Sequence, residues 1–276
     1  MKATKKIALL FVAAVGFLLA SRGQHAVAPS GVGSHPLKFD VASVKLARPD
    51  ESMRIMPTGD GFVAHSVTAI QLVLFAYHSL DASQPGEGIV KPEQIAGLPG
   101  WAKTLRFDFD AKVLSDQADL LQKGTTEQRR AVHQQMLASL LADRFRLVVH
   151  YKAGDAPVYA LVVKDRSKLR AADPASAGGC NMLFWTGNLH FNDCSVNQLA
   201  LGLSGQDDVG RIVVDRTGLS GAYEFRLKWA PYNNEESDEG PSLFSALKDQ
   251  LGLALVSARA PVNNLVVDSI EKPSQD

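Results

Sequence analysis

Residues that could act as nucleophiles are present in this chain, but the spacing of a hydrolase active-site turn is missing. In that turn the serine occupies G-x-S-x-G, because a sharp bend between a strand and a helix must expose its hydroxyl. The nearest strings are Gly202-Leu203-Ser204-Gly205 and Gly218-Leu219-Ser220-Gly221, and each is one residue short. We interpret the second string as a turn between strands, in which glycine supplies a positive φ angle.

Seven histidines offer imidazole nitrogens for acid–base or metal chemistry. Neither H-E-x-x-H nor H-x-H occurs, so no local group of residues has the spacing of a mononuclear metal site. His133 lies among polar residues of a predicted helix, and we expect it to be solvated. The sequence therefore predicts no catalytic residue, no metal ligand, no cofactor-binding residue and no cofactor. It leaves open a site assembled from distant segments.

Two further groups of residues could carry chemistry or bind a ligand. Asp215-Arg216-Thr217 places an acid, a base and a hydroxyl side by side after a predicted strand, and we interpret Asp215 as the cap of a turn. Trp101, Trp185 and Trp229 could form a binding platform, since aromatic rings on loops contact ligands well. The interpretation we prefer is that each ring covers the edge of its own core.

The only two cysteines, Cys180 and Cys194, flank a segment with turn-forming residues at Thr186-Gly187-Asn188. A hairpin at this place would bring the two sulfur atoms together. In an oxidising compartment the pair would form a disulfide, which stabilises a loop of this size by about 3 kcal/mol in the chain-entropy model. A reactive thiol or a metal site is the alternative, but His190 is the only nearby additional ligand. The sequence predicts the disulfide.

The first 28 residues have the pattern of a signal peptide. Three lysines precede the apolar run Ile7–Ala20, which is shorter than the roughly 20 residues of a membrane span. Ala26 and Ala28 could form the cleavage site, although a proline follows them. No cysteine follows the apolar run, which argues against a lipoprotein anchor. We expect export to the periplasm or the extracellular space, with contact to a membrane only if the signal segment is retained.

Charge argues against one class of partner. The whole sequence carries 29 basic and 29 acidic residues, and residues 1–28 hold four of the basic ones and no acid. The chain that remains after cleavage therefore carries a net charge of −4. A mildly acidic protein does not attract phosphate backbones, so we expect no nucleic-acid partner.

Four sequence blocks occur twice in the same order, which predicts a tandem duplication. The first repeat is expected over residues 38–168 and the second over residues 178–272. The paired blocks are 66–72 with 194–199, 107–112 with 223–228, 140–147 with 247–253, and 157–164 with 261–268.

Within each repeat we expect the order hairpin, helix, strand, strand, helix, strand, strand. Thr125 and Gln128 form a possible capping box for the clearest helix, whose apolar stripe includes Val132, Met136 and Leu140. Two separate strands are expected after each second helix. The acidic segment Asn233–Gly240 is interpreted as a solvated loop. These elements indicate an α+β fold with mixed sheets and helices packed on one face.

Several long motifs resemble a large family of uncharacterised secreted proteins that is expanded in soil bacteria of the acidobacterial lineage. The motifs are FDVASVK (39–45), LLADRFRLVVH (140–150), PVYALVV (157–163), VVDRTGLSGAYEFRLKW (213–229) and LVVDSIEKPS (265–274). The resemblance implies export. In some members a similar region follows a membrane-embedded peptidase module of the antibiotic-sensor type, and this chain has no apolar span after residue 20 that could belong to such a module. The family provides no catalytic residues.

A second resemblance concerns architecture alone. The order of helices and strands is similar to that of the short N-terminal domains of secretins and TonB-dependent receptors, which implies no function by itself.

Three functions compete on these observations. The first, which we prefer, is a non-catalytic extracytoplasmic binding or interaction module whose partner is an unknown envelope protein or peptide. A strand such as Val158–Lys164 could accept a peptide strand if it lies at a sheet edge. The second is a secreted hydrolase with a site in the cleft between the repeats, using His65 or His150 with an acid of the other repeat. The third is a structural component of the envelope.

Overall fold

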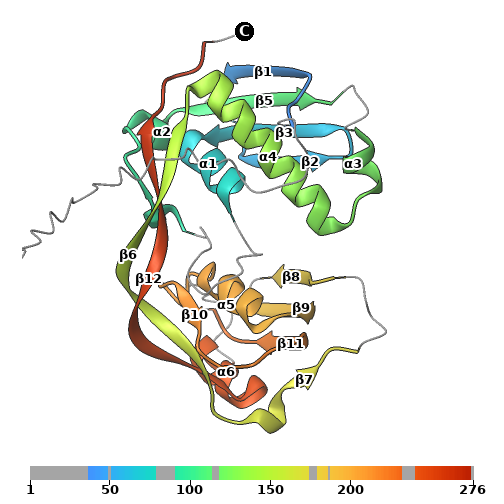
Figure 1. The fold of residues 1–276 in the computed structure, drawn as a ribbon, viewed down its shortest axis with the longest axis vertical. Helices are drawn as coiled ribbons and strands as arrows, with labels where there is room; N and C mark the ends of the chain where they lie inside the picture. The colour runs from blue at the N-terminus through green and yellow to red at the C-terminus, as the bar shows by residue number, and fades with distance from the viewer. Residues whose placement is uncertain are drawn as a thin grey trace, which may run out of the picture.

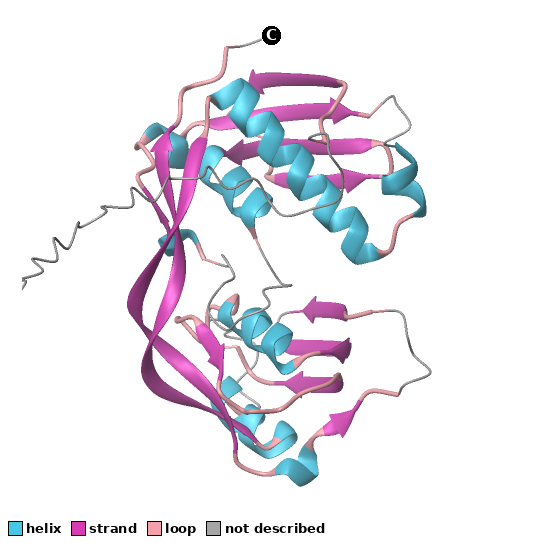
Figure 2. Ribbon diagram, in the orientation of Figure 1, coloured by secondary structure: helices cyan, strands magenta, loops and turns pink. Residues whose placement is uncertain are grey.

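Two lobes joined by a long two-stranded ribbon make up the described part of the chain in this computed structural model (Figures 1 and 2). The described residues are 37–48, 51–78, 91–113, 118–173, 179–185, 187–231 and 240–274. We call residues 37–145 the upper lobe and residues 166–251 the lower lobe. Strands β6 (Val148–Val163) and β12 (Leu253–Ser269) form the ribbon.

The α+β class predicted from the sequence is confirmed. The predicted signal peptide, residues 1–28, and nearly all of the acidic segment 233–240 lie outside the described residues. Within the described ranges, no helix is long and apolar enough to cross a membrane.

The upper lobe is an antiparallel sheet with helices on one face (Figure 2). Its strands, in spatial order, are β1 (Val41–Leu46), β5 (Arg106–Lys112), β3 (Gly61–Thr68) and β2 (Arg54–Thr58). Its helices are α1 (Ala69–Tyr77), α2 (Trp101–Thr104), α3 (Ala118–Lys123) and α4 (Thr126–Phe145). Alternate residues of β5 point inward, so Phe107 and Phe109 pack against Phe145 of α4.

Helix α4 forms as its sequence predicts. The Thr125 side chain accepts a hydrogen bond from the Gln128 backbone N–H, and the Gln128 side chain accepts one from the Thr125 backbone N–H. The predicted apolar stripe is buried against the sheet and α3. The helix ends at Arg146, whose φ of 52° places it in the left-handed conformation that closes many helices.

The lower lobe repeats the strand order of the upper lobe. From one edge to the other its antiparallel strands are β7 (Arg170–Ala171), β11 (Tyr223–Lys228), β9 (Asn188–Cys194) and β8 (Asn181–Trp185). Helices α5 (Val196–Ser204) and α6 (Leu243–Leu251) complete the lobe. Phe191 and Phe225 are fully buried at its centre.

The ribbon belongs to both lobes. Strands β6 and β12 pair antiparallel along almost their whole length, with Ala156 opposite Ala260 near the middle. Val149 lies in the upper core, whereas Leu161 lies in the lower core. One short strand from each lobe adds to the ribbon in parallel: β4 (Ile95–Ala96) beside β12 and β10 (Val213–Asp215) beside β6. Two short 3-10 helices precede β4 and β7, at Pro92–Gln94 (η1) and Arg166–Lys168 (η2).

The expectation of two separate strands at the end of each repeat is wrong. The segment around Gly154 and Pro157 has turn-forming residues, yet β6 runs through it without interruption because β12 pairs with every residue there. A proline is tolerated in a strand that has a neighbour on only one side, and β10 joins β6 only from Tyr159 onward. The sheet that contains the ribbon is mixed, while the sheets of the two lobes are antiparallel.

Candidate functional site

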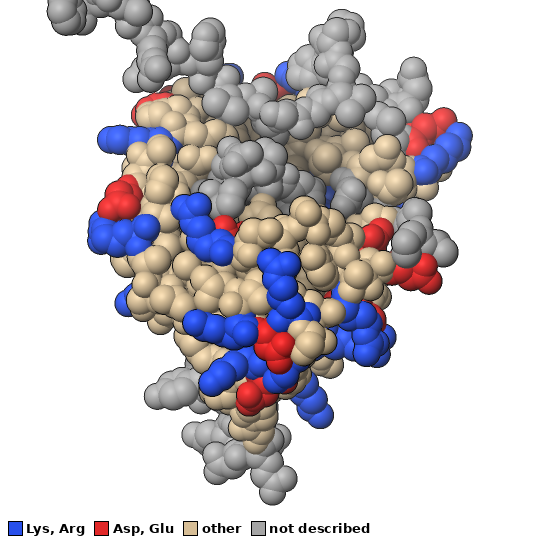
Figure 3. Space-filling view, turned by 60° about the horizontal axis from the view of Figure 1, so that its bottom comes forward, with Lys and Arg blue, Asp and Glu red and all other residues tan. Residues whose placement is uncertain are grey.

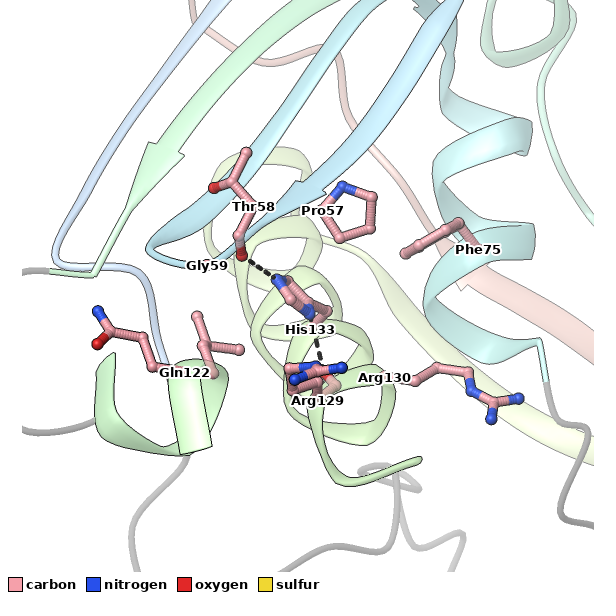
Figure 4. Close-up of a pocket in the computed structure, with 9 residues that line it drawn as sticks. Pro57, Thr58, Gly59, Phe75, Gln122, Arg129, Arg130 and His133 are labelled. Carbon is pink, nitrogen blue, oxygen red and sulfur yellow. Dashed lines mark hydrogen bonds between the residues drawn. The ribbon is translucent and has the colours of Figure 1, made fainter. Parts of the chain in front are cut away.

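A pocket of about 590 Å³ opens at the N-terminal end of α4 (Figure 4). It lies between the β2–β3 turn, α1, α3 and the first two turns of α4. Its lining is formed by Pro57, Thr58, Gly59, Phe75, Leu121, Gln122, Arg129, Arg130 and His133. A volume in this range fits a small organic ligand.

His133 fastens α4 to the β2–β3 hairpin beneath the pocket. The imidazole Nδ1 lies 2.8 Å from the Arg129 carbonyl oxygen, and Nε2 lies 3.1 Å from the Thr58 oxygen and 2.9 Å from the Gly61 oxygen (Figure 4 draws the Thr58 contact). The side chain is only 4% exposed, so the expectation of a solvated histidine is wrong. The hairpin turn covers this side of α4, which the helix pattern alone did not reveal. Both nitrogens are engaged with backbone oxygens and are not directed at a ligand.

The lining combines apolar surface with cationic groups. Leu121 is buried and Phe75 is partly buried, whereas Arg129 and Arg130 are half-buried beside them. Among the lining residues there is no carboxylate, and the Thr58 hydroxyl donates to Asp60. The first turn of a helix also favours negative charge through the helix dipole. This arrangement suits a ligand with an apolar body and an anionic group, and it offers no free nucleophile.

The histidines considered for a hydrolase do approach carboxylates. His150 in β6 lies with Nδ1 2.9 Å from an Asp268 oxygen of β12, so this pair joins the two expected repeats. Both side chains lie on the ribbon and are partly exposed. In the described part of the chain, the hydrogen bonds of His150 involve no serine, threonine or cysteine side chain. The pair therefore has the orientation of a catalytic dyad without a nucleophile in contact.

A second histidine–carboxylate group lies at a bulge in the upper sheet. The β3–β5 register shifts between Ala64 and Val67, and Ser66 adopts a φ of 52°. The Ser66 backbone N–H donates to Asp108 Oδ1 at 2.8 Å, which holds that carboxylate against the bulge. His65 Nδ1 lies 3.8 Å from the same oxygen, and a Glu51 oxygen completes a group whose atoms all lie within 4.8 Å of one another. Sequence reasoning missed this group because its members come from three segments with no common motif.

The lower lobe has an acid opposite the same kind of bulge. The β9–β11 register shifts beside Glu224, and Asp193 in β9 has a φ of 56°. Arg226 Nε donates to Glu224 at 2.6 Å, and Arg170 lies 3.5 Å away. The pKa of Glu224 is held below its ordinary value, first by the hydrogen bond from Arg226 and then by the charges of both arginines. Figure 3 shows Lys and Arg side chains gathered on the underside of the molecule with acidic side chains between them.

Cys180 and Cys194 form the disulfide predicted from the sequence. The bond ties the residue before β8 to the last residue of β9, so it closes the β8–β9 hairpin at its open end. Asp215 accepts hydrogen bonds from the backbone and hydroxyl of Thr217, which is the turn cap expected there. Gly218, with a φ of 66°, has the conformation expected of the turn.

Two of the three tryptophans cover a core and one does not. Trp101 stacks on Phe145, and Trp229 is buried and donates from Nε1 to Asp208 at 2.6 Å. Trp185 is 53% exposed on the edge strand β8. The strand Val158–Lys164 was considered for peptide binding on the condition that it lies at a sheet edge, and this condition is not met at Tyr159–Leu161, where β6 lies between β10 and β12.

Comparison with known proteins gives a family and no function. No curated protein matches the chain, and no solved structure matches it. A match to one family covers residues 88–270, which include β5, α4, both ribbon strands and the whole lower lobe. The expectation of an uncharacterised family is thereby confirmed: the chain belongs to the family DUF3738, described as protein of unknown function.

Proposed function

We propose that this chain is a non-catalytic, exported binding module that takes up a small amphipathic anion in the pocket at the end of α4. The single observation that carries the proposal is the pocket lining. Phe75 and Leu121 provide apolar surface, while Arg129 and Arg130 supply positive charge beside it. A carboxylate or phosphate group would lie near the arginines and the start of α4, and the apolar body would displace water from the remaining surface.

Binding is a better match than catalysis for the residues at this place. His133, the one lining residue with a titratable ring, has both nitrogens against backbone oxygens. A general base must reach the proton that it removes, and both nitrogens of His133 face backbone oxygens of the protein. The His150–Asp268 pair lies on the ribbon and contributes no residue to the lining.

Export is supported by the Cys180–Cys194 disulfide, because such bonds persist in the periplasm and outside the cell. The signal-peptide pattern of residues 1–28 points to the same compartment. A binding role also fits the resemblance to chains that follow sensor-type peptidase modules.

Titration calorimetry with sodium octanoate tests the proposal, with octanol as the uncharged probe and octyltrimethylammonium as the cationic one. We expect saturable binding of octanoate at one site and at least tenfold weaker binding of the two other probes. Arg130→Gln should weaken octanoate binding by about tenfold, since a charge-assisted hydrogen bond contributes roughly 1.5–3 kcal/mol. Arg259→Gln, which alters an arginine paired with Asp155 on the ribbon, is the matched control and should bind octanoate normally.

A second variant adds bulk to the pocket lining without disturbing the core. A Cβ added at Gly59 would meet no atom within 4 Å, so Gly59→Phe places a ring at the pocket wall with no backbone clash. This variant should retain the thermal stability of the parent protein and lose octanoate binding. Unchanged binding in Gly59→Phe, or equal binding of octanoate and octanol, would refute an anion site at this pocket.

A further inference from the structure

We propose that Glu51, His65 and Asp108 form a binding site for a divalent transition-metal ion, with Zn²⁺ as the reference ion. The three side chains come from the segment before β2, from β3 and from β5. None of them lines the pocket at the end of α4, so this site and the proposed function are independent.

The distances fit ligands of one ion better than direct contacts. His65 Nδ1 and Asp108 Oδ1 are 3.8 Å apart, which is too long for a hydrogen bond. Nitrogen and oxygen ligands lie about 2.0–2.2 Å from zinc, so two ligands of one tetrahedral ion are roughly 3.5 Å apart. All three ligand atoms lie within 4.8 Å of one another, and Glu51 is exposed, so a small side-chain rotation brings its carboxylate to the other two.

The bulge in β3 builds the site. A bulge redirects the side chain beside it, and His65 is the residue immediately before Ser66, whose φ of 52° marks the bulge. The Ser66 backbone N–H fixes Asp108 Oδ1 at 2.8 Å, while Arg106 Nη1 holds the Ser66 carbonyl oxygen at 2.8 Å. Such outer contacts orient metal ligands and raise affinity for the ion.

The donor set selects the class of ion. One imidazole nitrogen with two carboxylates suits zinc and its neighbours, whereas calcium and magnesium prefer oxygen ligands alone and in larger number. Three protein ligands leave a position open for water or for a group of a second molecule. The side chains of His65 and Asp108 are 43% and 25% exposed, so that position is accessible from solvent.

Two cations flank the site and limit its affinity. Arg54 lies opposite His65 in the β2–β3 register, and Lys45 lies opposite Asp108 in the β1–β5 register. Both are exposed and can extend into solvent, so they weaken ion binding without occupying the site. We therefore expect a weaker site than that of a structural zinc domain.

Titration calorimetry of the full-length, chelator-treated protein with zinc chloride tests the site. We expect His65→Ala and Asp108→Asn each to weaken zinc binding by at least tenfold, as loss of a ligand requires. Both substitutions leave the fold in place, because the His65 side chain is only partly buried and an asparagine at 108 still accepts the Ser66 N–H. Circular dichroism and the melting temperature check this.

His190→Ala is the matched control, since His190 lies 3.6 Å from Glu224 in the lower lobe. It should bind zinc as the parent protein does. His150→Ala serves the same purpose for the ribbon pair. Absence of zinc binding, unchanged binding in His65→Ala, a loss in either control, or calcium binding as tight as that of zinc would each overturn the proposal. Octanoate binding is measured on the same variants, so failure of this site is distinguished from failure of the pocket.

Discussion

The two lobes place an acid at the same position of the same strand order and surround it differently. Asp108 in β5 and Glu224 in β11 each lie opposite a bulge whose outer residue has a positive φ, Ser66 in one lobe and Asp193 in the other. Asp108 receives a backbone N–H and has His65 and Glu51 beside it. Glu224 accepts a hydrogen bond from the Arg226 guanidinium and has Arg170 and His190 beside it. One framework position thus holds a potential ligand in the upper lobe and a charge pair in the lower lobe.

The equivalent hairpins are also fastened by different means. Helix α4 has 20 residues, and its His133 bonds to the β2–β3 turn. Helix α6 has only 9 residues and packs on β11 and β12. At about 1.5 Å per residue, α6 is less than half as long as α4. The Cys180–Cys194 bond fastens the lower hairpin instead. A common origin of the lobes by duplication stays a prediction, and this difference shows how unlike two lobes with one strand order can be.

The largest loss of stability is expected when a large side chain is removed from either core. Phe109 and Phe225 are buried at matching positions of β5 and β11, and replacing a buried phenylalanine by alanine costs about 3–5 kcal/mol. Because both ribbon strands contribute to both cores, we expect the protein to unfold in a single transition. Phe109→Ala and Phe225→Ala should each move the midpoint of that transition to a lower urea concentration. Urea unfolding followed by tryptophan fluorescence and by circular dichroism measures this. Two separate transitions would show that the lobes are independent units.

Loss of the disulfide should destabilise the protein by about 3 kcal/mol, because the bond closes a loop of roughly 15 residues in the unfolded chain. The change is Cys180→Ser with Cys194→Ser, and the measurement is the free energy of unfolding in urea. Reduced parent protein is the control and should match the double variant. A difference between the two would mean that the serine hydroxyls, and not the missing bond, destabilise the hairpin.

Local features of both lobes could be predicted from the sequence. The capping residues Thr125 and Gln128 and the apolar stripe of α4 act within a few residues of one another, so their pattern predicts the helix directly. The disulfide required only that a hairpin join the two cysteines. Interactions between residues that are close in sequence can therefore be predicted from the sequence pattern.

The ribbon and the candidate sites could not be predicted in this way. Gly154 and Pro157 are typical of turns, and only pairing with the distant strand β12 extends β6 through them. Glu51, His65 and Asp108 meet because a bulge shifts the β3–β5 register, and nothing in the sequence indicates where that shift lies. His133 lies among the polar residues of α4 in the sequence, yet the β2–β3 hairpin buries it in the structure.

Alkaline pH should destabilise the chain through the upper lobe. Burial, and to a lesser extent the neighbouring Tyr151, raises the pKa of Tyr77 from 10.0 to about 12. Below pH 10 the phenol is protonated in the folded and the unfolded chain. Between pH 10 and 12 the unfolded phenol ionises first, so the free energy of unfolding falls, by up to about 2.7 kcal/mol at 1.36 kcal/mol per pKa unit.

The measurement is urea unfolding at several pH values from 8 to 12, with Tyr77→Phe as the control. The variant should lose less stability than the parent protein over this window. Burial also raises the pKa of Tyr151, so Tyr77→Phe is expected to reduce the alkaline loss without abolishing it. Equal losses in the two proteins would contradict a role for Tyr77.

The smallest expected effect tests the contrast between the two acids directly. Arg226→Gln removes the hydrogen bond that contributes most to the lowered pKa of Glu224, so that pKa should rise toward its ordinary value of 4.5. A carboxyl with a lowered pKa stabilises the folded chain above the unfolded pKa and loses this contribution as pH falls through the folded value. The variant should therefore be less stable than the parent protein near neutral pH and equally stable in acid, where Glu224 is protonated in both. Carboxyl carbon shifts followed by NMR against pH report the pKa, and Arg170→Gln, at 3.5 Å, should raise it less. If Arg226→Gln leaves that pKa unchanged, the hydrogen bond from Arg226 does not set the pKa of Glu224, and the charge pair assigned to the lower lobe is refuted.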